Sequence, residues 1–135
     1  MKNLFILSCL IISVMLAACN RQSTFDDRCE KEARQQTLQY CPQKIIDGLM
    51  LDSITYTRAK HRFSYYYTID DSMYVMDNMP DVREKLRADL LKSIKNSVEL
   101  KKAKENNVVF QYTYYGKYSQ KSVLRFTFEP QEYKH

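Results

Sequence analysis

The chain has 135 residues and a formal net charge of +5, from 21 lysines and arginines against 16 aspartates and glutamates. This excess is modest and contains no long basic run, so the composition argues against a nucleic-acid-binding protein. Only two glycines occur, Gly48 and Gly116, which excludes a glycine-rich phosphate-binding loop.

The N-terminus has the pattern of a bacterial lipoprotein signal peptide. Lys2 supplies the positive charge, an apolar run extends from Leu4 to Leu16, and the small residues Ala17 and Ala18 precede Cys19. The apolar run is shorter than the roughly 20 residues that a membrane span needs. We therefore expect residues 1–18 to be removed and Cys19 to carry acyl chains such as palmitate, which hold the protein on the lipid bilayer.

The rest of the chain is expected to form one domain. Residues 19–25 are predicted to be a lipidated tether, and residues 26–135 are long enough for a single hydrophobic core. Because the five polar residues 20–24 reach at most about 17 Å, we expect the domain to lie close to the membrane surface.

Two further cysteines, Cys29 and Cys41, remain in the predicted domain. The oxidising cell envelope favours a disulfide between them. However, residues 12 apart in one unbroken helix would lie about 18 Å apart along its axis, too far for a disulfide. The sequence leaves both alternatives open.

The spacing of apolar residues predicts six elements. Alternation with a period of two indicates strands, and apolar residues three, four and seven apart indicate a long amphipathic helix that begins near Pro80. The predicted elements are a helix at 27–39, strands at 49–58 and 62–69, a helix at 80–104, and strands at 108–115 and 122–128. We expect the C-terminal residues 131–135 to be frayed.

This order predicts an α+β fold with a four-stranded antiparallel sheet made of two hairpins. The long helix would pack across one face of the sheet, with the shorter N-terminal helix beside it. A short internal repeat supports the arrangement, because residues 63–67 and 110–114 share the pattern F-x-Y-x-Y. We expect these two segments to be neighbouring or equivalent strands that line one core.

The sequence contains no recognisable set of catalytic residues, so we expect a protein that is not an enzyme and needs no cofactor. His61 and His135 are the only histidines, and no Gly-x-Ser-x-Gly occurs, whereas a nucleophile needs an adjacent base. The acidic residues at 70, 71, 77 and 81 match no calcium loop. We interpret them as turn and cap residues and predict no metal site.

Tyrosine is the most distinctive residue type, with 11 copies. Most are predicted to be core residues, but those on the opposite sheet face would be exposed, where tyrosine is favoured for binding. The alternative is that the N-terminal helix covers them. The candidate binding patch consists of Tyr66, Tyr115, Tyr118, Arg62 and Arg125.

The Leu-Ala-Ala-Cys box at 16–19 resembles that of the many small lipoproteins of Bacteroides-type bacteria. The segments 51–54, 65–68 and 110–116 also resemble a loose group of uncharacterised envelope domains. This resemblance implies an outer-membrane protein and no catalytic residues. Because no acidic cluster follows Cys19, the resemblance further implies that the protein faces the periplasm rather than the cell surface.

These observations predict a membrane-anchored scaffold that binds an unidentified envelope protein, such as an accessory subunit of a secretion apparatus. The alternative is a periplasmic inhibitor or immunity protein against a toxin or hydrolase. Envelope co-purification would favour the scaffold, whereas killing of a deletion strain by sibling cells would favour the immunity protein.

Overall fold

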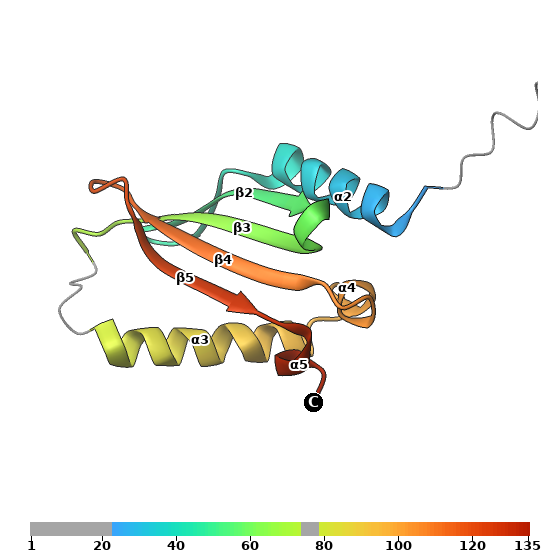
Figure 1. Cartoon of the computed structure of the whole chain (residues 1–135). Helices are drawn as coiled ribbons and strands as arrows, with labels where there is room; N and C mark the ends of the chain where they lie inside the picture. Colours follow the sequence, from blue (N-terminus) through green and yellow to red (C-terminus); the bar gives the residue numbers. More distant parts are fainter. Residues whose placement is uncertain (1–22, 74–78) are drawn as a thin grey trace, which may run out of the picture.

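The computed structural model describes residues 23–73 and 79–135, which form a mixed α+β domain (Figure 1). The predicted lipid site at Cys19 lies outside these residues. The strands are β1 (Gln43–Ile46), β2 (Leu49–Thr57), β3 (Arg62–Ile69), β4 (Val109–Gly116) and β5 (Ser122–Phe128). The helices are α2 (Phe25–Tyr40), α3 (Met79–Asn96), α4 (Lys101–Glu105) and α5 (Pro130–Tyr133), with the 3₁₀ turn η2 (Arg58–Lys60).

The class α+β is confirmed, but the predicted sheet of four antiparallel strands is wrong in two respects. The strand order is β1-β2-β3-β4-β5, and the central pair β3–β4 is parallel while the other three pairs are antiparallel. Two strands joined through a long helix form a crossover connection, which brings them together in parallel. The missed strand, β1, has four exposed residues and therefore no buried face that a period of two could reveal.

The repeated F-x-Y-x-Y segments are confirmed as neighbouring strands. Phe63 pairs with Phe110, and the tyrosines at 65 and 67 pair with those at 112 and 114. The tyrosine rings stack, with centroids 4.8 Å apart in both pairs. The parallel register thus places equal residues side by side on the face that forms the core.

The core lies on this one sheet face, between the sheet and the helices. Ile94 of α3 and Val108, Phe110 and Phe128 around β4 and β5 are completely buried. Figure 1 places α2 beside β2 and α3 beside β5. The two helices therefore cover opposite margins of the same face.

The predicted helix at 80–104 is interrupted. α3 ends at Asn96, and α4 begins at Lys101. Lys104 explains the end of α3, because its Nζ donates hydrogen bonds to the carbonyls of Ile94, Lys95 and Ser97 at 2.8–2.9 Å. A cation at the C-terminal end of a helix satisfies free carbonyls and the helix dipole. The break leaves Val98, at 78% exposure, outside the core.

The C-terminus is ordered, so the predicted fraying is wrong. Tyr133 of α5 is buried, and its hydroxyl donates to the Val108 carbonyl at 2.7 Å. Glu132 accepts a hydrogen bond from Arg87 of α3 at 2.6 Å. An aromatic anchor and an ion pair hold the short α5 against the domain.

The predicted N-terminal helix is confirmed as α2, with a start two residues earlier. Thr24 caps it: the Thr24 hydroxyl accepts from the Asp27 amide, and the Asp27 carboxylate accepts from the Thr24 amide. Thr37 bonds both the amide and the carbonyl of Ile54, each at 2.8 Å. The helix thereby closes the free edge of β2. Among the described helices, none is both long and apolar enough to cross a bilayer.

A groove between two helices as the candidate functional site

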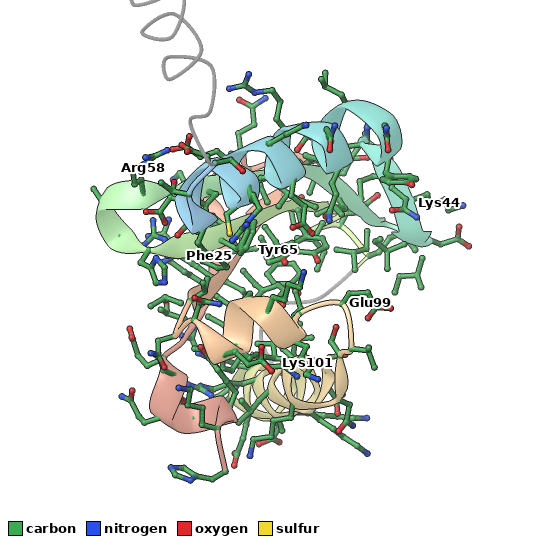
Figure 2. All side chains as sticks on the ribbon, turned by 90° about the vertical axis from the view of Figure 1, so that its right-hand side faces the viewer. Phe25, Lys44, Arg58, Tyr65, Glu99 and Lys101 are labelled. Carbon is green, nitrogen blue, oxygen red and sulfur yellow. The ribbon has the colours of Figure 1, made fainter. Side chains whose placement is uncertain are left out.

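A groove of about 520 Å³ lies over β3, between α2 and the segment 99–106. In Figure 2, Tyr65 lies in the opening below α2 and above α4. The apolar lining of the groove consists of Phe25, Cys29, Phe63, Tyr65, Leu100 and Ala103. The volume is within the range of binding sites in proteins.

The floor of the groove is aromatic. Phe63 is buried, whereas Tyr65 is only partly buried and stacks on Tyr112. Burial raises the pKa of Tyr65, so the phenol stays neutral at physiological pH. No described residue supplies a hydrogen bond to the Tyr65 hydroxyl. The groove therefore offers a flat apolar surface with a hydroxyl that is available to a partner.

The rim of the groove is charged. Arg28 and Glu32 lie one turn apart on α2, and Glu99 and Lys102 lie on the facing segment. All four side chains belong to exposed residues. Apolar floors with polar rims are typical of protein-binding surfaces.

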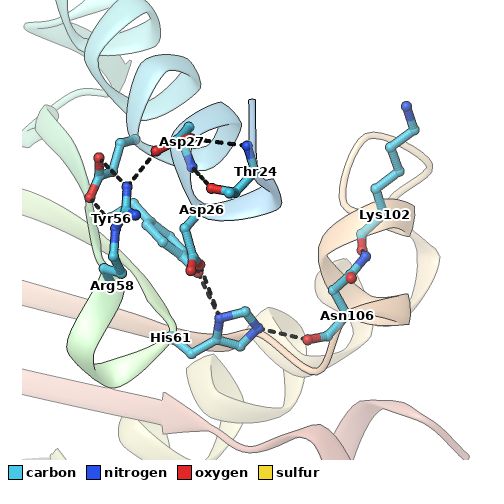
Figure 3. A network of polar contacts seen from close by, with 9 residues as sticks. Thr24, Asp26, Asp27, Tyr56, Arg58, His61, Lys102 and Asn106 are labelled. Carbon is cyan, nitrogen blue, oxygen red and sulfur yellow. Dashed lines mark hydrogen bonds and ion pairs between the residues drawn. The ribbon is translucent and has the colours of Figure 1, made fainter. Parts of the chain in front are cut away.

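A network of polar contacts fixes one end of the groove (Figure 3). The Tyr56 hydroxyl lies 2.5 Å from Asp26 Oδ1 and 2.7 Å from His61 Nδ1. The His61 Nε2–H donates to the Asn106 carbonyl at 2.7 Å. Because Asp26 lies in the first turn of α2 and Asn106 follows α4, these bonds join the two walls of the groove through the end of the sheet.

Arg58 of η2 also binds the first turns of α2. Its guanidinium bonds Asp27 at 2.7 Å and Glu30 at 3.0 and 3.2 Å. The hydrogen bond from Arg58, together with those from Thr24, lowers the pKa of Asp27 to about 2. The exposed ion pairs contribute little stability individually, but they fix the direction of the helix that forms one wall.

Cys29 and Cys41 are free thiols in the structure, so the alternative of a disulfide is not realised. The reason is that α2 continues without interruption from Phe25 to Tyr40, which separates the two positions along its axis. Burial, and then Glu32 and Asp26, raises the pKa of Cys29 to about 11. Cys29 is therefore a buried thiol that stays neutral and packs in the groove wall.

The predicted patch lies on the opposite face of the sheet, and its members are spread over that face. Tyr66 shares a row with Thr113 and Arg125 across three strands. Arg62 and Tyr115 lie at opposite ends of this face, six positions and roughly 20 Å apart. The patch is therefore not one compact site, and its role in binding stays a prediction.

Tyr118 lies away from the rest of the patch, in the hairpin between β4 and β5. It is 64% exposed, and its amide donates to Asp71 Oδ1 at 3.0 Å. Asp71 also accepts from the Ser119 amide at 3.1 Å, and these hydrogen bonds lower the pKa of Asp71. The interpretation of Asp71 as a turn residue is confirmed.

The described residues contain no group of three or more histidines, cysteines, aspartates and glutamates that could hold a metal ion. His61 is placed by a left-handed backbone with φ of 47°. Its ring contacts Asp26, Tyr56 and the Asn106 carbonyl. Neither free cysteine takes part in these contacts. His61 thus has a structural role in the polar network at one end of the groove.

A second hollow lies on the outer side of α2, against β2. It is lined mainly by side chains of mixed polarity, among them Glu30, Arg34, Thr37 and Thr55. Tyr56 is its only aromatic lining residue. Without an aromatic floor, this hollow is a weaker candidate than the groove over β3.

The fold and the groove define a small α+β domain with a two-helix cleft over a mixed sheet. Residues 24–125 match the model of a family described as a domain of unknown function, DUF8479. Because the match covers more than half of the chain, the protein belongs to this family. None of the curated proteins matches the chain.

Two solved structures share the fold. A predicted secreted protein of Pseudomonas aeruginosa has a TM-score of 0.69 at 12% identity, over 84% of this chain and 100% of that one. The pilotin of the Vibrio vulnificus type 2 secretion system, EpsS, has a TM-score of 0.61 at 6% identity, over 82% of this chain and 92% of that one. At these identities the likeness shows the fold alone.

The sequence did not reveal the groove, because its residues come from separate elements. The sequence pattern places Phe25 in the predicted tether and Leu100 and Lys102 within one predicted helix, whereas in the structure all three line the groove. One signal was present: Tyr65 belongs to the alternating aromatic strand, which was correctly predicted to face the helices. The predicted antiparallel sheet lacks the parallel pairing of β3 with β4.

Proposed function

We propose that this protein is a non-enzymatic, lipid-anchored binding module that holds a protein partner at the outer membrane, facing the periplasm. The observation that carries the proposal is the aromatic floor of the groove, which the two flanking helices leave partly open. Folded domains normally cover such apolar surfaces, and an exposed one indicates an interaction site. The lipid would come from acylation of Cys19.

The fold is consistent with an accessory role in the cell envelope. One structure of the same fold is a pilotin of a secretion system, and another is a predicted secreted protein. We extend this likeness to a class of role only, an accessory subunit of an envelope assembly. The groove, with its neutral Cys29 and its network-bound His61, supports binding rather than catalysis.

Crosslinking in intact cells tests this proposal. The anchored protein, purified after crosslinking, should bring down one envelope protein in a fixed ratio. A Cys19→Ala variant, which cannot be lipidated, should recover much less of it. Recovery of no specific envelope partner would reject the scaffold role. If a deletion strain is instead killed by sibling cells, the protein is an immunity protein.

A further inference from the structure

The groove is electrically polarised along its length. Phe25 and Arg28 lie in the first turn of α2. Asn106, which follows α4, is joined to this end through His61 and Asp26, and Lys102 lies one turn before Asn106. Figure 2 shows Phe25 and Glu99 on opposite sides of Tyr65. Glu32, one turn beyond Arg28, lies toward the Glu99 end. One end of the rim therefore carries two cations and the other carries two carboxylates.

The two cations are available to a ligand. Within the described residues, neither Arg28 nor Lys102 has an ion-pair partner, whereas Arg58 on the other side of α2 bonds both Asp27 and Glu30. Asp26, the carboxylate at this end, is engaged by Tyr56 and His61. Arg28 and Lys102 can thus each form an ion pair with an acidic group of a partner.

The backbone around the groove restricts the shape of an occupant. β3 is hydrogen-bonded to β2 on one side and to β4 on the other, and the walls are α2 and the 99–106 segment with α4. An extended peptide would find no free strand edge here, and its buried amides would lack partners. A helix satisfies its own backbone and needs only an apolar stripe to cover the floor.

From these observations, and resting on the proposed function, we propose the nature of the partner segment. It is an amphipathic helix whose apolar stripe covers Tyr65 and Leu100 and whose C-terminal end lies between Arg28 and Lys102. The negative end of its dipole and any terminal acidic side chains then meet the cations, while its N-terminal end meets Glu32 and Glu99. The bound helix therefore runs antiparallel to α2.

Site-specific photo-crosslinking in cells measures this orientation. A benzophenone amino acid is placed at Phe25 in one variant and at Gln36 in another, eleven positions and about 16 Å apart on α2. Mass spectrometry then locates both crosslinks in the partner. In the partner sequence, we expect the residue crosslinked from Phe25 to lie about 11 residues C-terminal to the residue crosslinked from Gln36. The spacing is equal because the bound helix and α2 have the same rise per residue. The reverse order, or a separation of only about five residues as for an extended chain, would overturn the proposal.

A charge reversal tests the two cations independently. We expect the double variant Arg28→Glu and Lys102→Glu to lower the yield of crosslinked partner by about tenfold. The matched control, Arg34→Glu and Lys101→Glu, makes the same charge change on the same two helices outside the groove and should keep the yield. Circular dichroism melts should show equal stability for both variants. Equal yields would also overturn the proposal.

These outcomes separate the inference from the proposed function. A partner that is captured from another face of the domain would reject the groove occupant but leave the binding role intact. Complete absence of a partner would reject both.

Discussion

The Tyr56 hydroxyl lies 2.7 Å from His61 Nδ1, at the point where three parts of the chain meet. Tyr56 belongs to β2, His61 follows η2, and the hydroxyl also contacts Asp26 at the start of α2. The second ring nitrogen of His61 reaches the Asn106 carbonyl. One hydroxyl and one imidazole thus connect both walls of the groove to the sheet.

Removal of this hydroxyl tests the connection. We expect Tyr56→Phe to lower the free energy of unfolding by about 1–3 kcal/mol, because the partly buried His61 and Asp26 lose a shared hydrogen-bond partner. Urea denaturation measures the change. Tyr40→Phe is the control, since Tyr40 is 62% exposed and should give a change near zero. Equal effects of the two substitutions would contradict the role of the network.

Acid should weaken the start of α2 through Asp27. The folded-state pKa of Asp27 is about 2, against an ordinary value of 3.8. A carboxylate with a lowered pKa contributes stability above its ordinary pKa and loses it as the pH falls toward the folded value. We therefore expect the wild-type protein to lose more unfolding free energy between pH 4 and pH 2 than Asp27→Asn does.

Denaturation series at several pH values provide the measurement. Asp89→Asn, on an exposed position of α3, is the control and should follow the wild-type pH profile. If Asp27→Asn also follows that profile, the hydrogen bond from Arg58 does not lower the pKa as described.

The C-terminal helix should stabilise the domain through Tyr133. We expect Tyr133→Phe to destabilise the fold by about 1–3 kcal/mol, because the Val108 carbonyl is buried and would lose its side-chain donor. Thermal melts compare it with Tyr118→Phe, where the hydroxyl is exposed. If Tyr133→Phe melts like the wild type, α5 does not anchor the end of the chain.

Among the apolar residues of helix α3, Ile94 is expected to contribute most to its docking. Ile94 is completely buried, whereas Val98 and Val82 are 78% and 53% exposed. Ile94→Ala should therefore cost about 2–5 kcal/mol through lost burial and a cavity, and Val98→Ala less than about 0.5 kcal/mol. Chemical denaturation distinguishes the two. Similar losses of unfolding free energy for both variants would show that the apolar residues along this helix are buried more evenly than the structure indicates.

The elements with strong periodicity could be predicted from the sequence. The strand at 122–128 and the aromatic pairing of residues 63–67 with 110–114 follow from alternation with a period of two. These residues form a core because one face carries nearly all of the large apolar side chains. The local pattern and the tertiary packing agree, which makes such elements predictable.

The parts that depend on distant partners could not be predicted from local pattern. Lys104 ends α3 by reaching three carbonyls across a turn, and Tyr133 becomes ordered only by contact with Val108. The exposed strand β1 is defined by its pairing with β2. The groove is a consequence of where α2 and α4 lie relative to β3, so its residues share no spacing in the sequence.

The most direct test of the groove compares partner capture by variants of the two sheet faces. Gln36→Trp places a bulky ring in the groove, whereas Arg125→Trp places the same ring on the opposite face. After crosslinking in cells, we predict that Gln36→Trp loses the envelope partner and that Arg125→Trp retains it at the wild-type level. Retention by Gln36→Trp together with loss by Arg125→Trp would contradict the groove and favour the opposite face.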